Sequence, residues 1–146
     1  MKIKLFGLAL VGALIAGASA IAAGNPIVAT PLGVGQMQAT TIHAKAGAMI
    51  LTSIKIAPGG SFGWHTHGSA VAVVVTVGTL TVFDPAVAKC APFKVSKGQA
   101  FIEPAGHVHL ARNDGTVPAK VYAMYLGIPK GTQANIAGST PKGCNA

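Results

Sequence analysis

The sequence predicts an all-β fold, a sandwich or a closed barrel, in a single domain. Short runs rich in β-branched residues recur along the chain, Gly- and Pro-containing turns separate them, and no stretch has the 3.6-residue spacing of an amphipathic helix. Many short strands without intervening helices are typical of a sandwich or barrel. A chain of 146 residues has room for one hydrophobic core and not for two.

Residues 1–20 are predicted to be a secretory signal peptide. Lys2 and Lys4 precede an uncharged apolar run, and Ala18-Ser19-Ala20 supplies the small residues of a cleavage site. The apolar run is shorter than a membrane-spanning helix requires. We therefore expect no stable membrane span after cleavage and a mature protein that is periplasmic or secreted. Residues 21–35 are rich in Gly and Pro, and we expect them to form an extended lead-in.

The predicted strands occupy residues 36–127 and are separated by turn-forming residues. Pro58, Gly78, Pro104 and Gly115 mark these turns, because Pro and Gly supply the fixed or positive φ angles of tight reversals. The expected strands are Met49 to Ala57, Val71 to Val77, Thr79 to Phe83, Gln99 to Glu103, His107 to Arg112 and Ala119 to Leu126. Residues 128–146 are expected to form an irregular C-terminal tail.

Cys90 and Cys144 are the only cysteines of the chain. Export would place them in an oxidising compartment, where an even pair is most simply a disulfide. Such a bond would hold the tail to the loop that carries Cys90. A thiol-ligated metal site is the alternative, although the chain has no Cys-x-x-Cys pair.

The composition argues against several classes of function. The formal net charge is +8, but the lysines are scattered singly and no basic run is interleaved with aromatic residues. We therefore expect no nucleic-acid partner. The chain also has no G-x-S-x-G elbow, no Walker loop and no pair of carboxylates suited to a glycosidase.

Four of the five histidines form two His-x-His pairs, His65/His67 and His107/His109. Residues two apart in a strand point to the same face, so each pair can present two imidazoles to one space. Neighbouring imidazoles on one face are a ready metal-binding arrangement. For a single pair, the alternative is a surface histidine or a hydrogen-bonded core histidine. Two such pairs favour a metal site assembled from both.

Longer patterns around these pairs resemble the two motifs of the cupin superfamily, and in particular its small exported single-domain members. The first motif has a Gly, a His-x-His pair, a Glu and a second Gly, and it is matched except that Val71 stands in the Glu position. The second motif, with a Gly, a Pro-x-Gly, a His and an Asn, is matched in full. The matching residues are Gly59 or Gly60, His65, His67 and Gly78 in the first motif, and Gly98, Pro104, Gly106, His109 and Asn113 in the second.

The resemblance implies a double-stranded β-helix, or jelly-roll barrel, that holds one divalent metal through His65, His67 and His109. Three answers remain open for the missing carboxylate. The site could use three histidines alone, as in three-histidine cupin dioxygenases, or Glu103 could return a carboxylate to the metal, or the barrel could hold no metal and bind an organic ligand. A histidine shell suits Fe, Zn, Cu or Ni, and a Glu ligand adds Mn to the candidates.

Two functions follow as hypotheses. The first is an exported metal-binding cupin that performs oxygenase-like or isomerase-like chemistry on a small-molecule substrate, with His107 and Glu103 as the candidate acid–base residues. The second is a non-catalytic cupin that binds a metal or a small ligand in the cell envelope. The family resemblance also suggests a homodimer, although the sequence shows no interface.

Overall fold

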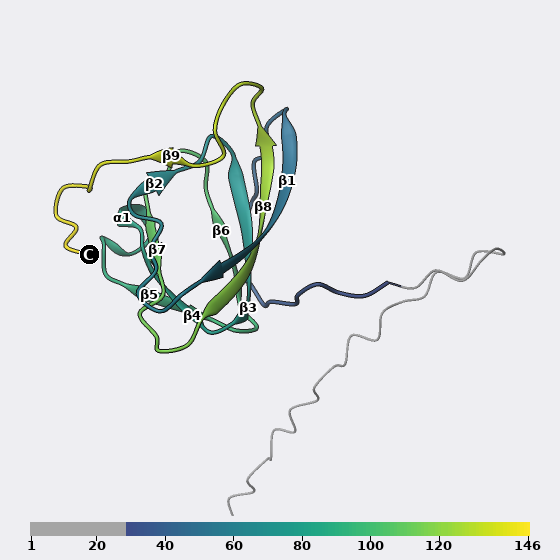
Figure 1. Cartoon of the computed structure of the whole chain (residues 1–146). Coiled ribbons are helices and arrows are strands. Elements are labelled where there is room, and N and C mark those ends of the chain that lie inside the picture. The colour runs from purple at the N-terminus through teal and green to yellow at the C-terminus, as the bar shows by residue number, and fades with distance from the viewer. Residues whose placement is uncertain (1–28) are drawn as a thin grey trace, which may run out of the picture. The chain divides into compact units, whose positions relative to one another are not determined.

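The computed structural model describes residues 29–146, so the predicted signal peptide and the first part of the lead-in lie outside the described residues. Within these residues the chain forms nine strands and one helix of a single turn (Figure 1). The strands are β1 (Ala48–Ile56), β2 (His65–Thr66), β3 (Ala70–Val77), β4 (Thr79–Phe83), β5 (Phe93–Ser96), β6 (Ala100–Glu103), β7 (Leu110–Arg112), β8 (Ala119–Ile128) and β9 (Ile136–Ala137), and the helix is α1 (Pro85–Ala88).

Two antiparallel sheets face each other across the core. One sheet has the strand order β1-β8-β3-β6, the other has the order β5-β4-β7, and β2 pairs with β9 near one end of the barrel (Figure 1). Neighbours such as β3 and β8 are far apart in the sequence, as a jelly roll requires. The predicted all-β jelly-roll fold is therefore confirmed.

Alternation along the central strands builds the core. In β3, Val71, Val73 and Val75 are buried, and the residues between them are only partly buried. The ten residues of β8 alternate in the same way over most of their length. Because side chains alternate between the two faces of a strand, one face of each strand fills the space between the sheets. Burying each such Val contributes about 1.5–3 kcal/mol to the stability of the fold.

The segment before β1 contacts the barrel at Gln36. Gln36 donates a backbone hydrogen bond to Gly98 (2.8 Å) and accepts one from Ala100 (2.8 Å), which forms a short parallel bridge to Gln99. The chain divisions that the sequence predicts at residues 20, 35 and 127 stay predictions.

The short strands β2 and β5 were not among the expected elements, and three further features differ from them. β7 begins at Leu110 rather than His107, because the preceding residues form a turn in which the His107 amide donates to the Pro104 carbonyl (3.3 Å) and Gly106 has a φ of +81°. Helix α1 was not expected, because four residues are too few to produce a helical pattern. Its first turn is capped by the Asp84 side chain, which accepts from the Ala86 amide at 2.8 Å.

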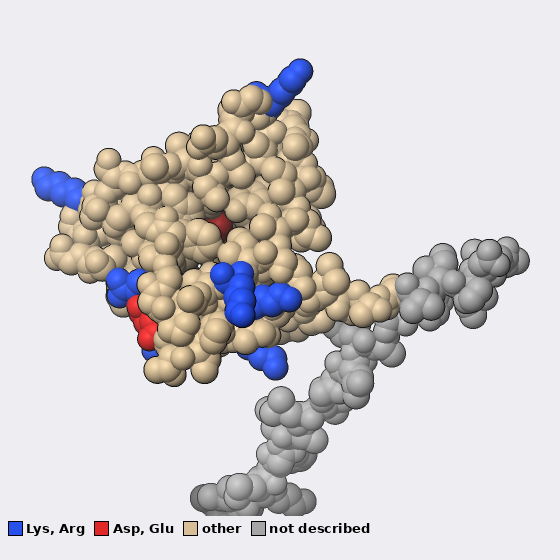
Figure 2. Space-filling view, viewed as in Figure 1, with Lys and Arg blue, Asp and Glu red and all other residues tan. Residues whose placement is uncertain are grey.

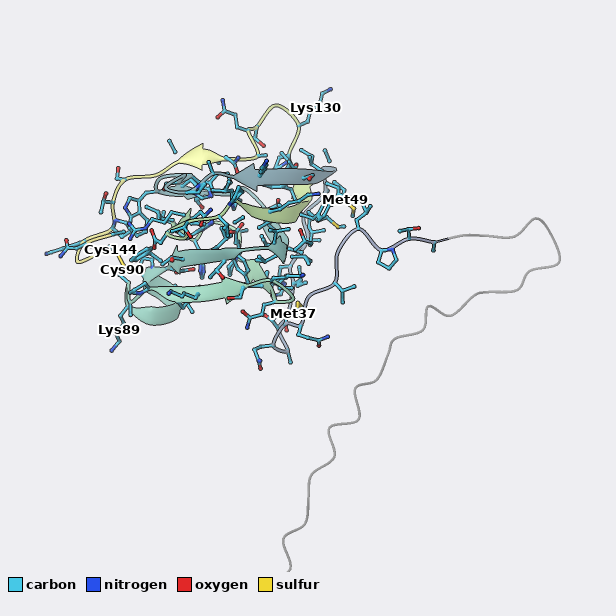
Figure 3. All side chains as sticks on the ribbon, turned by 60° about the horizontal axis from the view of Figure 1, so that its bottom comes forward. Met37, Met49, Lys89, Cys90, Lys130 and Cys144 are labelled. Carbon is cyan, nitrogen blue, oxygen red and sulfur yellow. A yellow bond between two sulfur atoms is a disulfide. The ribbon has the colours of Figure 1, made fainter. Side chains whose placement is uncertain are left out.

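The C-terminal tail is the third difference, because it contains β9 rather than being irregular throughout. A disulfide joins Cys90 to Cys144, with their Cα atoms 5.3 Å apart, and Figure 3 shows the two residues side by side near Lys89. The predicted disulfide is thus present, and it holds the end of the tail against the segment that follows α1. In the part of the chain that the structure describes, no helix is long and apolar enough to cross a membrane.

Candidate metal centre

The His65 and His109 side chains are brought together by a reciprocal backbone pair. The amide of each residue donates to the carbonyl of the other, and both hydrogen bonds are 2.9 Å long. Directly opposed residues in an antiparallel pair place their side chains on the same face. The two imidazole rings accordingly lie 4.4 Å apart, centroid to centroid. A backbone contact between segments that are 44 residues apart in the sequence therefore forms the first half of the site.

His67 completes a cluster of three buried imidazoles. It lies two residues beyond His65, on the same side of the chain, and its ring centroid is 4.9 Å from that of His65 and 5.1 Å from that of His109. One ligand nitrogen from each of the three residues lies within 4.8 Å of the other two. The three histidines are therefore positioned to bind one metal ion.

A backbone carbonyl fixes the orientation of each ring. The Nδ1 atoms contact the carbonyls of Gly63 (3.0 Å, from His65), Ala134 (2.8 Å, from His67) and His107 (3.1 Å, from His109). A carbonyl can only accept, so each Nδ1 carries the proton, and each neutral ring presents the unprotonated Nε2. This tautomer is the one in which an imidazole coordinates through Nε2, with the carbonyl holding the other nitrogen.

The carboxylate of Glu103 faces this cluster from the other sheet. Its two oxygens lie 3.1 Å from His67 Nε2 and 3.3 Å from His109 Nε2. Neither contact forms a hydrogen bond, so among the described residues both nitrogens are buried without a hydrogen-bond partner. When the rings are neutral, lone pairs of two imidazoles and a carboxylate therefore converge at this point. A cation at this position would satisfy all of them, so the donor set fits a metal ion.

Glu103 lies across the β3–β6 ladder from the position of the missing motif glutamate. In the β3–β6 ladder, Glu103 lies directly opposite Val71, which is fully buried. Directly opposed residues share a face of the sheet. The carboxylate therefore enters the barrel beside the position where the first cupin motif has its Glu, but from β6 instead of β3.

The pKa shifts describe the same attraction for positive charge. Burial alone would raise the pKa of the Glu103 carboxyl, but the nearby imidazoles of His109 and His67 outweigh it and lower that pKa to about 2. Burial lowers the pKa of His65. Burial also acts to lower the pKa of His109, but the Glu103 carboxylate outweighs it and raises that pKa. A single anionic carboxylate thus makes the interior of the cluster favourable for a cation.

His107 does not join the cluster. Its side chain is 39% exposed, and its Nδ1 atom lies 3.7 Å from the Asp84 carboxylate rather than near the three rings. The expectation that both histidines of the second pair share one space is wrong, because His107 belongs to the turn before β7 and strand alternation does not extend to it. Its predicted acid–base role stays a prediction.

A small chamber lies next to the cluster inside the barrel. Its volume is about 30 Å³, and its walls are mainly apolar, with polar members His65, His67, Glu103, Tyr125 and Asn135. The Tyr125 hydroxyl donates to the Asn135 side chain (3.2 Å), and the Tyr125 ring packs edge-on against His67 at 5.4 Å. In Figure 2 an acidic group lies deep in a hollow near the centre of the face shown, while lysine and arginine side chains project outward.

No sequence pattern indicated the part that the tail plays in this site. Ala134 supplies the carbonyl that orients His67, β9 pairs with β2 through the His65–Ala137 register, and the Gly138 amide donates to the Trp64 carbonyl at 2.8 Å. Backbone carbonyls carry no residue signature, so the motif pattern could not reveal them. The buried Asn113 of the second motif acts structurally: its Nδ2 donates to the Ile56 (3.1 Å) and Val117 (2.8 Å) carbonyls.

Comparisons with known proteins find relatives for part of this chain. A germin-like protein of Arabidopsis thaliana (subfamily 2 member 1) is 43% identical over 96 residues, which are 62% of this chain and 44% of that protein. Nectarin-1 of Nicotiana langsdorffii x Nicotiana sanderae is 37% identical over 90 residues, or 58% and 38% of the two chains. The match thus spans less than half the length of these relatives.

Solved structures show the same fold. A polyketide cyclase from Streptomyces resistomycificus superposes with a TM-score of 0.54 at 18% identity, over 66% of this chain and 65% of that one. Residues 52–125, half of the chain, match the family model of the cupin domain, and this segment includes all three clustered histidines and Glu103. The chain is therefore a member of the cupin superfamily.

Proposed function

We propose that this chain is an exported cupin that holds one divalent transition metal through the Nε2 atoms of His65, His67 and His109 and the carboxylate of Glu103. The observation that carries the proposal is the convergence of these donors, two of them buried without a hydrogen-bond partner. Three imidazoles and one carboxylate suit Fe, Zn, Cu, Ni or Mn better than Mg or Ca, which prefer oxygen-only shells.

We propose further that the metal centre acts on a small oxygen-bearing molecule, in chemistry of the oxygenase or isomerase type. A bound metal would supply Lewis-acid or redox chemistry at the centre. Backbone carbonyls orient the imidazoles. The chamber walls are largely apolar, so they exclude bulk water. Glu103 is the carboxylate beside the centre, and because its pKa is lowered to about 2 it is ionised there and can accept a hydrogen bond or a proton from a bound molecule.

Metal titration of the purified, untagged protein tests the ligand set. Glu103→Gln should lower the metal affinity about 10- to 100-fold or more, because losing an outer-shell partner alone costs that much. Asp114→Asn is the matched control, since that exposed carboxylate pairs with Arg112, away from the cluster, and its removal should leave the affinity unchanged. Equal affinity in the Glu103→Gln variant and in the wild type would remove Glu103 from the shell.

A double variant tests whether Glu103 is a relocated motif carboxylate. Because Val71 and Glu103 are direct cross-strand partners, Val71→Glu with Glu103→Val moves the carboxylate back to the motif position on the same face. We expect it to recover most of the metal affinity that Glu103→Val alone loses. A double variant as weak as the single variant would show that the carboxylate cannot act from the neighbouring strand.

A non-catalytic cupin that binds a metal or small ligand is the second candidate, and the chamber size favours it. A volume of about 30 Å³ holds one or two waters, since a water needs roughly 10–15 Å³ on this measure. Oxygen consumption by Fe(II)-loaded protein with diketones, phenols and thiols distinguishes the candidates. Turnover that requires His109 supports the enzyme, and stoichiometric metal binding without turnover supports the binding protein.

We also propose a periplasmic or secreted location with a cleaved signal peptide. The Cys90–Cys144 disulfide supports this, because disulfides persist mainly in oxidising compartments. Mass spectrometry of the protein recovered from the native host's envelope or medium should give a mature chain that begins at Ile21. An intact Met1 in the mature protein would contradict the proposal.

A further inference from the structure

A second, larger cavity shares Glu103 with the metal chamber and is lined by His109 as well. Its volume is about 150 Å³, five times that of the chamber. The apolar wall comes from β4, β5 and β6 through Val82, Phe93, Phe101 and Ile102. The first turn of α1 contributes Val87, which is 64% exposed and therefore reaches the surface. The cavity is thus bounded by both sheets and by α1.

The size and lining of this cavity suit a small apolar body. An apolar cavity of about 150 Å³ lined by aliphatic and aromatic side chains accepts a benzene-sized ligand. Here Phe93 and Phe101 supply aromatic surface and Val82 and Ile102 supply aliphatic surface. The metal chamber is too small for such a body, so an organic ligand of this size fits only the second cavity among the spaces that adjoin the cluster.

A buried carboxylate gives the cavity a charged end. The Asp84 side chain is only 7% exposed. One of its oxygens caps α1 through the Ala86 amide, whereas the other lies 3.7 Å from His107 Nδ1, too far for a hydrogen bond. That Nδ1 atom is itself buried without a hydrogen-bond partner among the described residues. Asp84 therefore keeps acceptor capacity inside an apolar cavity.

The few acidic residues of the chain are concentrated at this cavity. The chain has three acidic residues and a formal net charge of +8, yet two of the three acids, Asp84 and Glu103, line the same cavity. Buried carboxylates favour a cationic partner that donates hydrogen bonds, and they disfavour an anion. A ligand ammonium group near Asp84 would also lie close to the faces of aromatic rings, which attract cations.

We propose that this cavity binds a small primary amine with a benzene-sized apolar body, whose ammonium group pairs with Asp84. The binding depends on no metal. Glu103 and His109 line this cavity and belong to the histidine cluster as well, so a bound amine lies beside the metal centre. Only this last statement, which makes the amine a candidate substrate or effector of the centre, rests on the proposed function.

Calorimetric titration of the full chain tests the proposal, with benzylamine as the probe. Toluene has a similar body without the charge, and benzoate has the opposite charge. We expect benzylamine to bind more tightly than toluene, and benzoate not to bind. Asp84→Asn should weaken benzylamine binding about 10- to 100-fold, as expected for a lost charge-assisted hydrogen bond, while toluene binding stays unchanged.

Two controls separate binding from folding. Asn is as good a helix cap as Asp, so the Asp84→Asn variant should keep the wild-type melting temperature. Asp114→Asn removes the exposed third carboxylate, which pairs with Arg112, and should not change benzylamine affinity. Methyl NMR should show shifts at Val82 and Ile102 on addition of benzylamine.

The experiment is run on both metal-stripped and metal-loaded protein, so the two proposals can fail independently. Benzylamine binding without metal binding would support the amine site and refute the metal centre. Equal affinities for benzylamine and toluene, no effect of Asp84→Asn, no binding at millimolar benzylamine, or methyl shifts elsewhere would each overturn the amine site.

Discussion

Removal of the Cys90–Cys144 disulfide should strongly destabilise the fold. The two cysteines are 54 residues apart in the sequence, and the chain-entropy model gives about 4 kcal/mol at 25 °C for a loop of this length. For a domain of this size, 1 kcal/mol corresponds to roughly 3–5 °C in Tm, so we expect the Tm to fall by about 10–20 °C. The variant carries Cys90→Ala and Cys144→Ala. Ala is used rather than Ser because it adds no buried hydroxyl.

Urea denaturation of the metal-stripped protein measures this effect, with the fluorescence of Trp64, the only tryptophan, as the signal. The two single Ala variants are the informative controls. If the cross-link acts, breaking it from either side removes the same bond, so each single variant should lose about as much as the double variant, within roughly 0.5 kcal/mol. Reduced wild-type protein should show a similar loss.

Amide exchange gives a local readout of the same change. The disulfide holds the end of the tail, and the tail supplies the Gly138 amide to Trp64 and the Ala134 carbonyl to His67. We expect the Gly138 amide to exchange faster without the bond, since segments with fewer constraints open at lower free energy. Two outcomes would refute the reasoning that the cross-link stabilises the fold by loop closure. The first is a loss of unfolding free energy in the double variant that equals the sum of the losses in the two single variants. The second is a double variant whose stability lies within about 1 kcal/mol of wild type.

Three further predictions concern single residues. Asn113→Ala should lower the free energy of unfolding in urea by about 2–4 kcal/mol, because it leaves buried backbone partners without hydrogen bonds. Lys89→Gly should raise the free energy of unfolding by about 0.5–1 kcal/mol, and with it the Tm, because Lys89 has a φ of +48° and Gly adopts a positive φ without steric cost. Ultraviolet titration of the metal-free protein should resolve its two tyrosines: the hydrogen bond with Lys120 lowers the pKa of Tyr122, burial raises the pKa of Tyr125, and Tyr125→Phe should remove only the later step.

The residues that carry side-chain chemistry were predictable from the sequence, and the backbone groups that orient them were not. His65 and His67 stand out as a pair because strand alternation places both on one face, and the structure keeps them there. His109 matches the second motif and meets His65 through backbone hydrogen bonds. The position of His107 could not be predicted, because the turn at Gly106 ends the alternation before the strand begins.

The tail shows why the rest of the site was hidden. Its expected irregularity follows from its Gly, Pro and Asn content, yet β9 forms because it pairs with β2, where the Trp64 carbonyl accepts from the Gly138 amide. Such pairing depends on tertiary context rather than on local propensity. Helix α1 and the cavity beside it were missed for a similar reason, because the cap at Asp84 and the disulfide after the helix stabilise a single turn that has no periodic pattern.

The opposition of Val71 and Glu103 has a consequence for how ligand sets are inferred in small barrels. A motif search along one strand finds valine and no carboxylate, whereas inspection across the ladder finds a carboxylate one strand away. Because opposed positions share a face, evolution can exchange a donor between adjacent strands while the backbone stays in place. Chains that lack the first-motif acid should therefore be sorted by the residue that opposes that position, before they are grouped with barrels that coordinate by nitrogen alone.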